Sequence, residues 1–132
     1  MITTINEYKN LENSVATFII NSKNEILILQ RGSTAPWMPN KWNLPGGIID
    51  KNESKIHTAI RECKEETNLI IDNLVELVSY TDPDFIITFY YTKQFIGDVI
   101  IDWESKDYKW VNKKDLLTYD FVPYIKNAIK LL

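Results

Sequence analysis

The sequence predicts a mixed α/β domain in which helices cover both faces of a central β-sheet. Runs rich in β-branched and aromatic residues lie on both sides of one long amphipathic helix, and a second amphipathic helix ends the chain. The chain has 132 residues, which is enough for one hydrophobic core. We therefore expect a single domain over residues 1–132, built as an α/β/α sandwich.

The first part of the chain predicts a β-hairpin and then a loop. The apolar runs 14–21 and 25–31 are joined by the polar turn Asn21-Ser22-Lys23-Asn24. Residues 32–41 are polar and contain two prolines, so they are expected to form a loop. Residues 42–44 should be extended, because Pro45 disfavours a helix immediately before it.

The main helix is predicted to begin at Ser54 and to end at about Thr67. Asn52 or Ser54 can cap its first turn, and Asn68 tolerates the left-handed conformation that commonly ends a helix. One face of this helix is apolar and should pack on the sheet. That stripe consists of Ile56, Ala59, Ile60, Cys63 and Thr67.

The second half of the chain predicts two strands and then three further elements. The two strands, 74–81 and 85–96, flank the turn Asp82-Pro83-Asp84. The further elements are a strand at 108–111, a helical turn at 113–117 and a C-terminal amphipathic helix at 122–132. Pro123 is compatible with this helix, because the first helical turn needs no amide donor.

An unusual density of glutamates follows the glycine turn at 45–47. Glu53, Glu62, Glu65 and Glu66 fall within fourteen residues. The last three are spaced three and four apart, so they share one face of the helix beside the apolar stripe. Like charges placed in this way repel each other, and a hard divalent cation would remove the repulsion. Because Mg²⁺ prefers carboxylate and phosphate oxygens, the pattern indicates a metal site for a phosphorylated substrate.

Residues 47–69, here called the box segment, resemble the signature of the Nudix hydrolases of the MutT type. The family pattern is G-x5-E-x7-R-E-U-x-E-E-x-G-U, in which U is a bulky aliphatic residue. The matching positions are Gly47, Glu53, Arg61, Glu62, Glu65, Glu66 and Leu69. Cys63 stands at an aliphatic position and Asn68 replaces a glycine, so neither departure changes a charged position. The resemblance implies the Nudix fold, an α/β/α sandwich with a mixed central β-sheet.

The resemblance also implies hydrolysis of a phosphoanhydride bond with Mg²⁺, or with Mn²⁺ as a substitute. The implied metal ligands are the Gly46 carbonyl and the carboxylates of Glu62, Glu65 and Glu66. Glu62 is the first candidate for the general base and Glu65 the second. Glu53 is expected either to orient Arg61 or to bind a secondary metal.

Further residues are expected near the site. Glu104 falls where some family members have another metal ligand or base, and Asp107 is the competing position; both can instead be solvated loop acids. Arg31 is a candidate for phosphate contact, and Trp37 is a candidate for stacking on a base. Gly47 is expected to contact the substrate, because it presents no Cβ to the site.

Composition limits the partners and the location of the protein. A net charge of −3 argues against general nucleic-acid binding, and no stretch reaches the ~20 apolar residues of a membrane span. A single cysteine cannot form an internal disulfide, and residues 1–11 contain no apolar run typical of a signal peptide. We therefore expect a cytoplasmic protein, with its oligomeric state open and a homodimer among the options.

The box segment positions a diphosphate and does not select the group attached to it. We expect a (deoxy)nucleoside triphosphate, cleaved to a monophosphate and pyrophosphate. ADP-ribose, dinucleoside polyphosphates, nucleotide sugars and capped RNA stay open as alternatives. A non-catalytic, nucleotide-sensing Nudix-like domain is the alternative from another class, and the intact set of carboxylates disfavours it.

Overall fold

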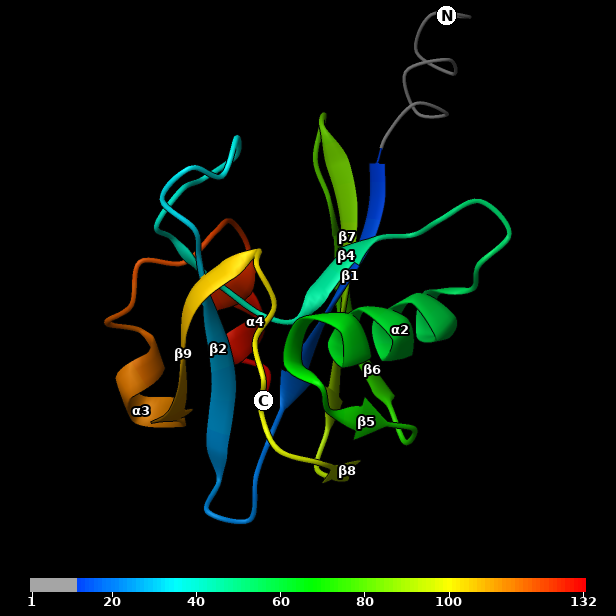
Figure 1. Cartoon of the computed structure of the whole chain (residues 1–132). Coiled ribbons are helices and arrows are strands. Elements are labelled where there is room, and N and C mark those ends of the chain that lie inside the picture. Colours follow the sequence, from blue (N-terminus) through cyan, green and yellow to red (C-terminus); the bar gives the residue numbers. More distant parts are fainter. Residues whose placement is uncertain (1–11) are drawn as a thin grey trace, which may run out of the picture.

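The structure is a computed structural model in which residues 12–132 are described (Figure 1). Its strands are β1 (Glu12–Ile19), β2 (Glu25–Arg31), β3 (Trp42–Asn43), β4 (Gly46–Ile48), β5 (Ile70–Ile71), β6 (Val75–Thr81), β7 (Phe85–Thr92), β8 (Phe95–Ile96) and β9 (Ser105–Asn112). Its helices are α2 (Lys55–Thr67), α3 (Lys113–Leu116) and α4 (Ile125–Ile129). The expectation that residues 1–11 lack a signal peptide concerns a segment outside the described residues.

The largest sheet is mixed, as predicted. Its strand order is β4-β1-β7-β6, in which β1 runs parallel to β7 and antiparallel to β4. A second, antiparallel sheet has the order β3-β2-β9, and β5 pairs antiparallel with β8. The predicted hairpin is present only at its turn, because β1 and β2 lie in different sheets and are joined by a single antiparallel bridge between Ile20 and Ile26. The chain therefore passes from one larger sheet to the other over a short turn.

Successive side chains of β1 enter two different hydrophobic cores. Phe18 packs in the cluster that contains Ile125 of α4, whereas Ile19 packs in the cluster that contains Cys63 of α2. This alternation is the period of a strand whose two faces are both covered. Figure 1 shows α2 and α4 on different sides of β1. The predicted sandwich of helix, sheet and helix is therefore confirmed.

Helix α2 begins and ends at the capping residues that the sequence indicates. The Ser54 hydroxyl accepts a hydrogen bond from the His57 amide at 3.1 Å. Asn68 is left-handed, with φ of 67°, and its amide donates to the Lys64 carbonyl at 3.0 Å. These caps satisfy backbone groups that a helix terminus otherwise leaves unpaired, and they fix where the helix carries its glutamates.

The predicted apolar stripe of α2 is wrong at its first residue. Ile56 is 47% exposed, although it points in nearly the same direction round the helix as the buried Cys63. Ile56 belongs to none of the core clusters, so its direction round the helix alone did not decide its burial. Conversely, Thr58 and Glu66 are buried. The covered face is therefore more polar than the sequence suggested.

Two predicted elements are shorter in the structure. The strand predicted at 85–96 is interrupted after Thr92, whose hydroxyl bonds the backbone of Gln94 and turns the chain. Of the helix predicted at 122–132, only α4 is present in the structure. The helix cannot begin earlier, because Tyr124 has φ of 74°, which a right-handed helix cannot contain. Among residues 12–132, none of the helices combines the length and hydropathy needed to cross a membrane.

Candidate active site

Strand β4 brings the two glycines of the turn against the glutamates of α2. The Gly46 amide donates to Glu66 Oε1 at 3.2 Å. A Cβ atom at Gly46 would lie 2.1 Å from the Val15 carbonyl oxygen, and one at Gly47 would lie 2.6 Å from Glu62 Cδ. Both distances are below any real contact. At Gly46 the obstacle is the backbone of β1, so this position requires glycine, whereas at Gly47 the obstacle is the Glu62 side chain, which would have to move. The contact that the structure shows for Gly46 is through its amide, whereas the sequence pointed to its carbonyl.

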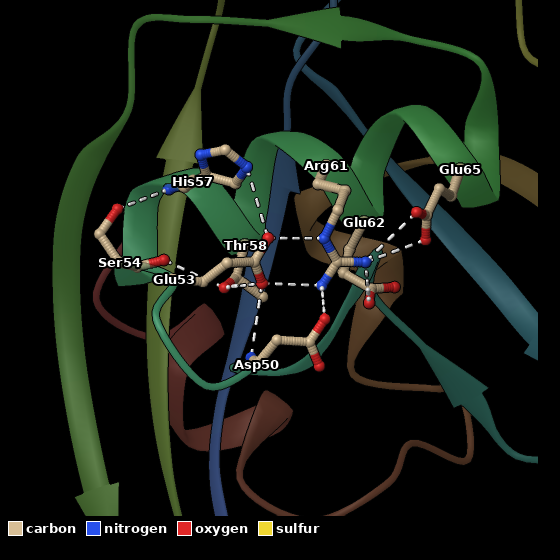
Figure 2. Close-up of polar contacts among 8 residues, drawn as sticks. All are labelled: Asp50, Glu53, Ser54, His57, Thr58, Arg61, Glu62 and Glu65. Atoms are coloured by element: carbon tan, nitrogen blue, oxygen red, sulfur yellow. Dashed lines mark hydrogen bonds and ion pairs between the residues drawn. The ribbon is translucent and has the colours of Figure 1, made fainter.

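Arg61 binds several carboxylates at once (Figure 2). Its Nε and Nη2 atoms donate to the two oxygens of Glu53 at 2.7 and 2.9 Å. Its Nη1 atom donates to Glu62 at 3.0 Å and to Glu65 at 3.1 Å. Its Nη2 atom also reaches Asp50 Oδ2 at 3.3 Å. The guanidinium therefore fixes the loop before α2 and two helix carboxylates relative to each other.

Glu53 is held as an anion by these contacts. Its side chain is only 14% exposed and also accepts a hydrogen bond from the Thr58 hydroxyl at 2.9 Å. The hydrogen bonds from Arg61 lower the pKa of Glu53 from its ordinary value of 4.5 to about 2, against the opposing effect of burial. His57, which is exposed, lies 3.4 Å from the same carboxylate. The contact between Glu53 and Arg61 that the sequence suggested is therefore present.

This lowered pKa predicts a contribution of Glu53 to acid stability. A carboxyl group whose pKa is lower in the folded state stabilises the fold above its unfolded pKa and loses that effect as the pH falls. We expect the free energy of unfolding of wild type to exceed that of Glu53→Gln at neutral pH. The difference should shrink as the pH falls from about 4.5 to about 2. Urea denaturation of both proteins across this pH range measures the difference in the free energy of unfolding. A difference that is independent of pH would contradict the lowered pKa of Glu53.

Glu66 is the buried carboxylate of the site. It is 7% exposed, and the only hydrogen bond that the structure gives its carboxylate within residues 12–132 comes from the Gly46 amide. Burial raises the pKa of Glu66 well above its ordinary value, and the nearby Glu62 and Glu104 carboxylates raise it further. Glu62 and Glu104 are therefore near enough to Glu66 to repel its negative charge, and Arg61 makes no hydrogen bond to Glu66 that would offset this repulsion.

Glu104 directly precedes β9, and its carboxylate lies within electrostatic reach of Glu62 and Glu65. Partial desolvation raises the pKa of Glu104, and so do the carboxylates of Asp102 and Glu62, while Arg31 lowers it. The competing residue Asp107 is exposed, and its carboxylate accepts a hydrogen bond from the Tyr108 amide at 2.8 Å. Of the two acids, the structure brings Glu104 to the helix glutamates.

Arg31 and Trp37, both predicted to contact substrate, contact each other. Arg31 Nε donates to the Trp37 carbonyl at 2.8 Å, and its guanidinium lies over the Trp37 ring at 5.2 Å from the centroid. Trp37 is 45% exposed. Two further hydrogen bonds hold the same loop at Asn40: Lys106 donates to the Asn40 side chain, and Gln30 donates to the Asn40 carbonyl. The loop is therefore fastened beside the acidic groups.

The carboxylates of the site are suitable ligands for a hard divalent cation, although they are not yet arranged around one point. Among residues 12–132, no three His, Cys, Asp or Glu side chains are already arranged to hold a metal ion, and Glu62 and Glu65 are turned to Arg61. However, Glu66 is buried beside like charges, an arrangement that a cation would stabilise. Carboxylate oxygens are the ligands that Mg²⁺ and Mn²⁺ accept.

Sequence reasoning missed two members of the site. Asp50 binds Arg61, and Thr58 binds Glu53. Asp50 lies in the loop before α2, where no periodicity assigns a direction to a side chain. Thr58 lies four residues after Ser54 on the helix, so its position facing the loop could have been derived from helical spacing.

A mixed sheet between two helices, with a glycine turn set against helix glutamates, defines the class of protein. The NUDIX domain family matches residues 10–132, and the chain therefore belongs to the Nudix family. Within that family it is of the MutT type. The MutT protein of Methanosarcina mazei superposes with a TM-score of 0.74 at 25% identity, covering 91% of each chain. The MutT structure studied from Aliivibrio salmonicida and Vibrio cholerae has the same fold, with a TM-score of 0.81 at 24% identity, covering 93% of this chain and 100% of that one.

Two relatives with named activities align over most of their length. The RNA pyrophosphohydrolase of a Nitratiruptor species is 33% identical, over 93% of this chain and 90% of the relative. The 8-oxo-dGTP diphosphatase of Escherichia coli (strain K12) is 32% identical, over 80% of this chain and 83% of the relative. Both names denote enzymes that cleave phosphoanhydride bonds.

Other relatives are much longer than this chain. The chain matches 26% of the length of a nudix hydrolase of Caenorhabditis elegans and 15% of the length of nudix hydrolase 8 of Arabidopsis thaliana. The identities over these shorter alignments are 35% and 38%. These two alignments agree with the family assignment and give no information on the substrate of this chain.

Proposed function

We propose that this chain is a Mg²⁺-dependent pyrophosphohydrolase that cleaves a nucleoside diphosphate linked to another group. The preferred substrate is a (deoxy)nucleoside triphosphate, which gives a nucleoside monophosphate and pyrophosphate. The observation that carries the proposal is the buried Glu66 carboxylate, which lies beside Glu62 and the glycine turn. The named activities of the two long-aligned relatives support the same reaction class.

The positions of the acidic residues support the roles that we propose for them. We assign metal binding to the Gly46 carbonyl and to the carboxylates of Glu62, Glu65, Glu66 and Glu104. When bound, Mg²⁺ supplies charge neutralisation on the phosphates and makes water more acidic. Glu62 is the first candidate for the general base, because Arg61 fixes one of its oxygens, and Glu65 is the second.

Other residues orient the reaction. The pair Glu53 and Arg61 holds the helix carboxylates in place and is a positioning pair, since Glu53 lies on the far side of the guanidinium from Glu62 (Figure 2). Arg31 supplies a positive charge beside Glu104 for a substrate phosphate, and Trp37 offers a ring face for stacking. Gly47 has no Cβ, so the Glu62 carboxylate can lie against its backbone, and we assign this backbone a contact with the substrate.

Hydrolysis of a nucleotide panel tests the proposal. The panel contains (d)NTPs, oxidised dGTP, ADP-ribose, NADH, diadenosine polyphosphates and a short 5′-triphosphate RNA, with products separated by chromatography. We expect release of monophosphate and pyrophosphate from a triphosphate, activity with Mg²⁺ or Mn²⁺, and loss of activity with EDTA. Preference for another member of the panel would correct the substrate. Absence of turnover of every member by folded protein with metal would favour a nucleotide-sensing domain.

A further inference from the structure

Trp103 is the most exposed large apolar side chain among residues 12–132, and it directly precedes Glu104, an acid of the candidate site. It is 87% exposed, whereas tryptophan is usually well covered. It occupies a corner of a tight turn in which the Ser105 amide donates to the Asp102 carbonyl at 3.4 Å. The Glu104 amide donates to Asp102 Oδ1 at 3.1 Å. The exposed ring of Trp103 is therefore carried by a backbone turn that hydrogen bonds hold in place.

The segment that carries Trp103 is fastened at both ends. On one side the Ile100 amide donates to the Thr67 carbonyl at 2.9 Å, at the last residue of α2. On the other side the Gly32 amide donates to the Glu104 carbonyl at 3.2 Å, directly after β2. The segment thus runs from the C-terminal end of the glutamate helix to the base of the loop that holds Trp37. Figure 1 shows this yellow segment between α2 and β2.

The charges around Trp103 indicate which part of a nucleotide it can contact. Its two chain neighbours are Asp102 and Glu104, and both would repel a phosphate group. The positive charge near Glu104 belongs to Arg31, whose guanidinium lies over the Trp37 ring. The phosphates of a substrate should therefore lie beside Arg31 and the carboxylates that bind the metal. The uncharged ring of Trp103 is suited to the flat, uncharged base.

We propose that Trp103 is a substrate-binding residue that stacks on the nucleobase of the substrate at the rim of the site. This inference rests on the proposed function, because it takes the diphosphate to lie on the glutamates of α2. A stacked base gains contact with a ring that is otherwise in water, without a hydrogen bond that would select one base. The residue should therefore strengthen binding of purine nucleotides in general, with little preference between adenine and guanine.

Equilibrium binding tests this role separately from catalysis. The probes are the α,β-methylene analogues of ATP and GTP, with inorganic tripolyphosphate as a probe that has no base, each titrated calorimetrically in Mg²⁺. We expect Trp103→Ala to weaken binding of both nucleotides by roughly 5- to 150-fold, and Trp103→Phe to weaken it less. Tripolyphosphate should bind both variants as it binds wild type. Ile100→Ala, which removes an exposed apolar side chain from the same segment, is the matched control and should leave all affinities unchanged.

The outcomes separate the two proposals. Nucleotide affinity unchanged in Trp103→Ala would overturn the stacking role, and so would an equal loss of affinity for tripolyphosphate, or wild type that binds no nucleotide. Affinity that depends on Trp103 without turnover of the substrate panel would support stacking and overturn the hydrolase. In an active enzyme, Trp103→Ala should raise KM by a similar factor and leave kcat nearly unchanged, since the ring is remote from the reacting phosphorus.

Discussion

Replacing Glu66 with glutamine should lower kcat roughly a thousandfold while the protein remains folded. A metal ion at this kind of site stabilises the transition state by several kcal/mol, and about 4 kcal/mol corresponds to that factor. Glutamine has the shape of glutamate but keeps only one oxygen and no charge, so it is a poor ligand for a hard cation. Steady-state kinetics across a Mg²⁺ titration measures the effect.

The stability of the same variant distinguishes a ligand from a structural residue. Glu66 is buried, its neighbours include Glu62 and Glu104, and it accepts one amide hydrogen bond that a glutamine oxygen can also accept. Loss of its charge should therefore leave the metal-free protein as stable as wild type or more stable. Mg²⁺ should raise the Tm of wild type more than that of Glu66→Gln.

A surface substitution provides the control for Glu66→Gln. Glu76→Gln changes the same chemical group on β6, where the side chain is 54% exposed and lies 4.0 Å from Lys55 Nζ. We expect its kcat and its response to Mg²⁺ to match wild type. If Glu66→Gln kept most of its activity, the carboxylate would not be a metal ligand. A large loss of stability in metal-free buffer would instead assign it a structural role.

The sequence predicted the part of the site that depends on helical spacing. The positions of Glu62, Glu65 and Glu66 on one face follow from separations of three and four residues, and local capping by Ser54 and Asn68 set the limits of the helix. These features depend on residues close in the chain. Local chemistry is therefore sufficient to recover them.

Features that depend on distant contacts were not predictable in the same way. The burial of Glu66 depends on β4, a strand of three residues that has no readable alternation. The convergence of Glu104 on the helix depends on the path of residues 97–104, which hydrogen bonds to α2 and Gly32 determine. The shortened C-terminal helix depends on the left-handed backbone of Tyr124, a residue type that rarely adopts it.

Alanine at the two neighbouring glycines should give opposite phenotypes. At Gly46 the added Cβ would lie 2.1 Å from the Val15 carbonyl oxygen and 2.9 Å from Ala16 Cα. These are backbone atoms within paired strands, so β4 must move away from β1. We expect Gly46→Ala to lose about 3 kcal/mol of stability or more, which lowers Tm by roughly 10 °C for a domain of this size. Thermal and urea denaturation measure this loss.

At Gly47 the added Cβ meets a side chain instead of the backbone. The nearest atom is Glu62 Cδ at 2.6 Å, near the end of a flexible chain that can rotate away. Gly47→Ala should therefore cost less than about 1 kcal/mol of stability but displace the Glu62 carboxylate, lowering kcat roughly tenfold or more. Because neither glycine has a positive φ, steric contact and not backbone strain decides both results. Equal stability losses in the two variants would show that the Glu62 side chain cannot move away from a Cβ at position 47. Full activity in Gly47→Ala would show that Glu62 does not act from the position it has here.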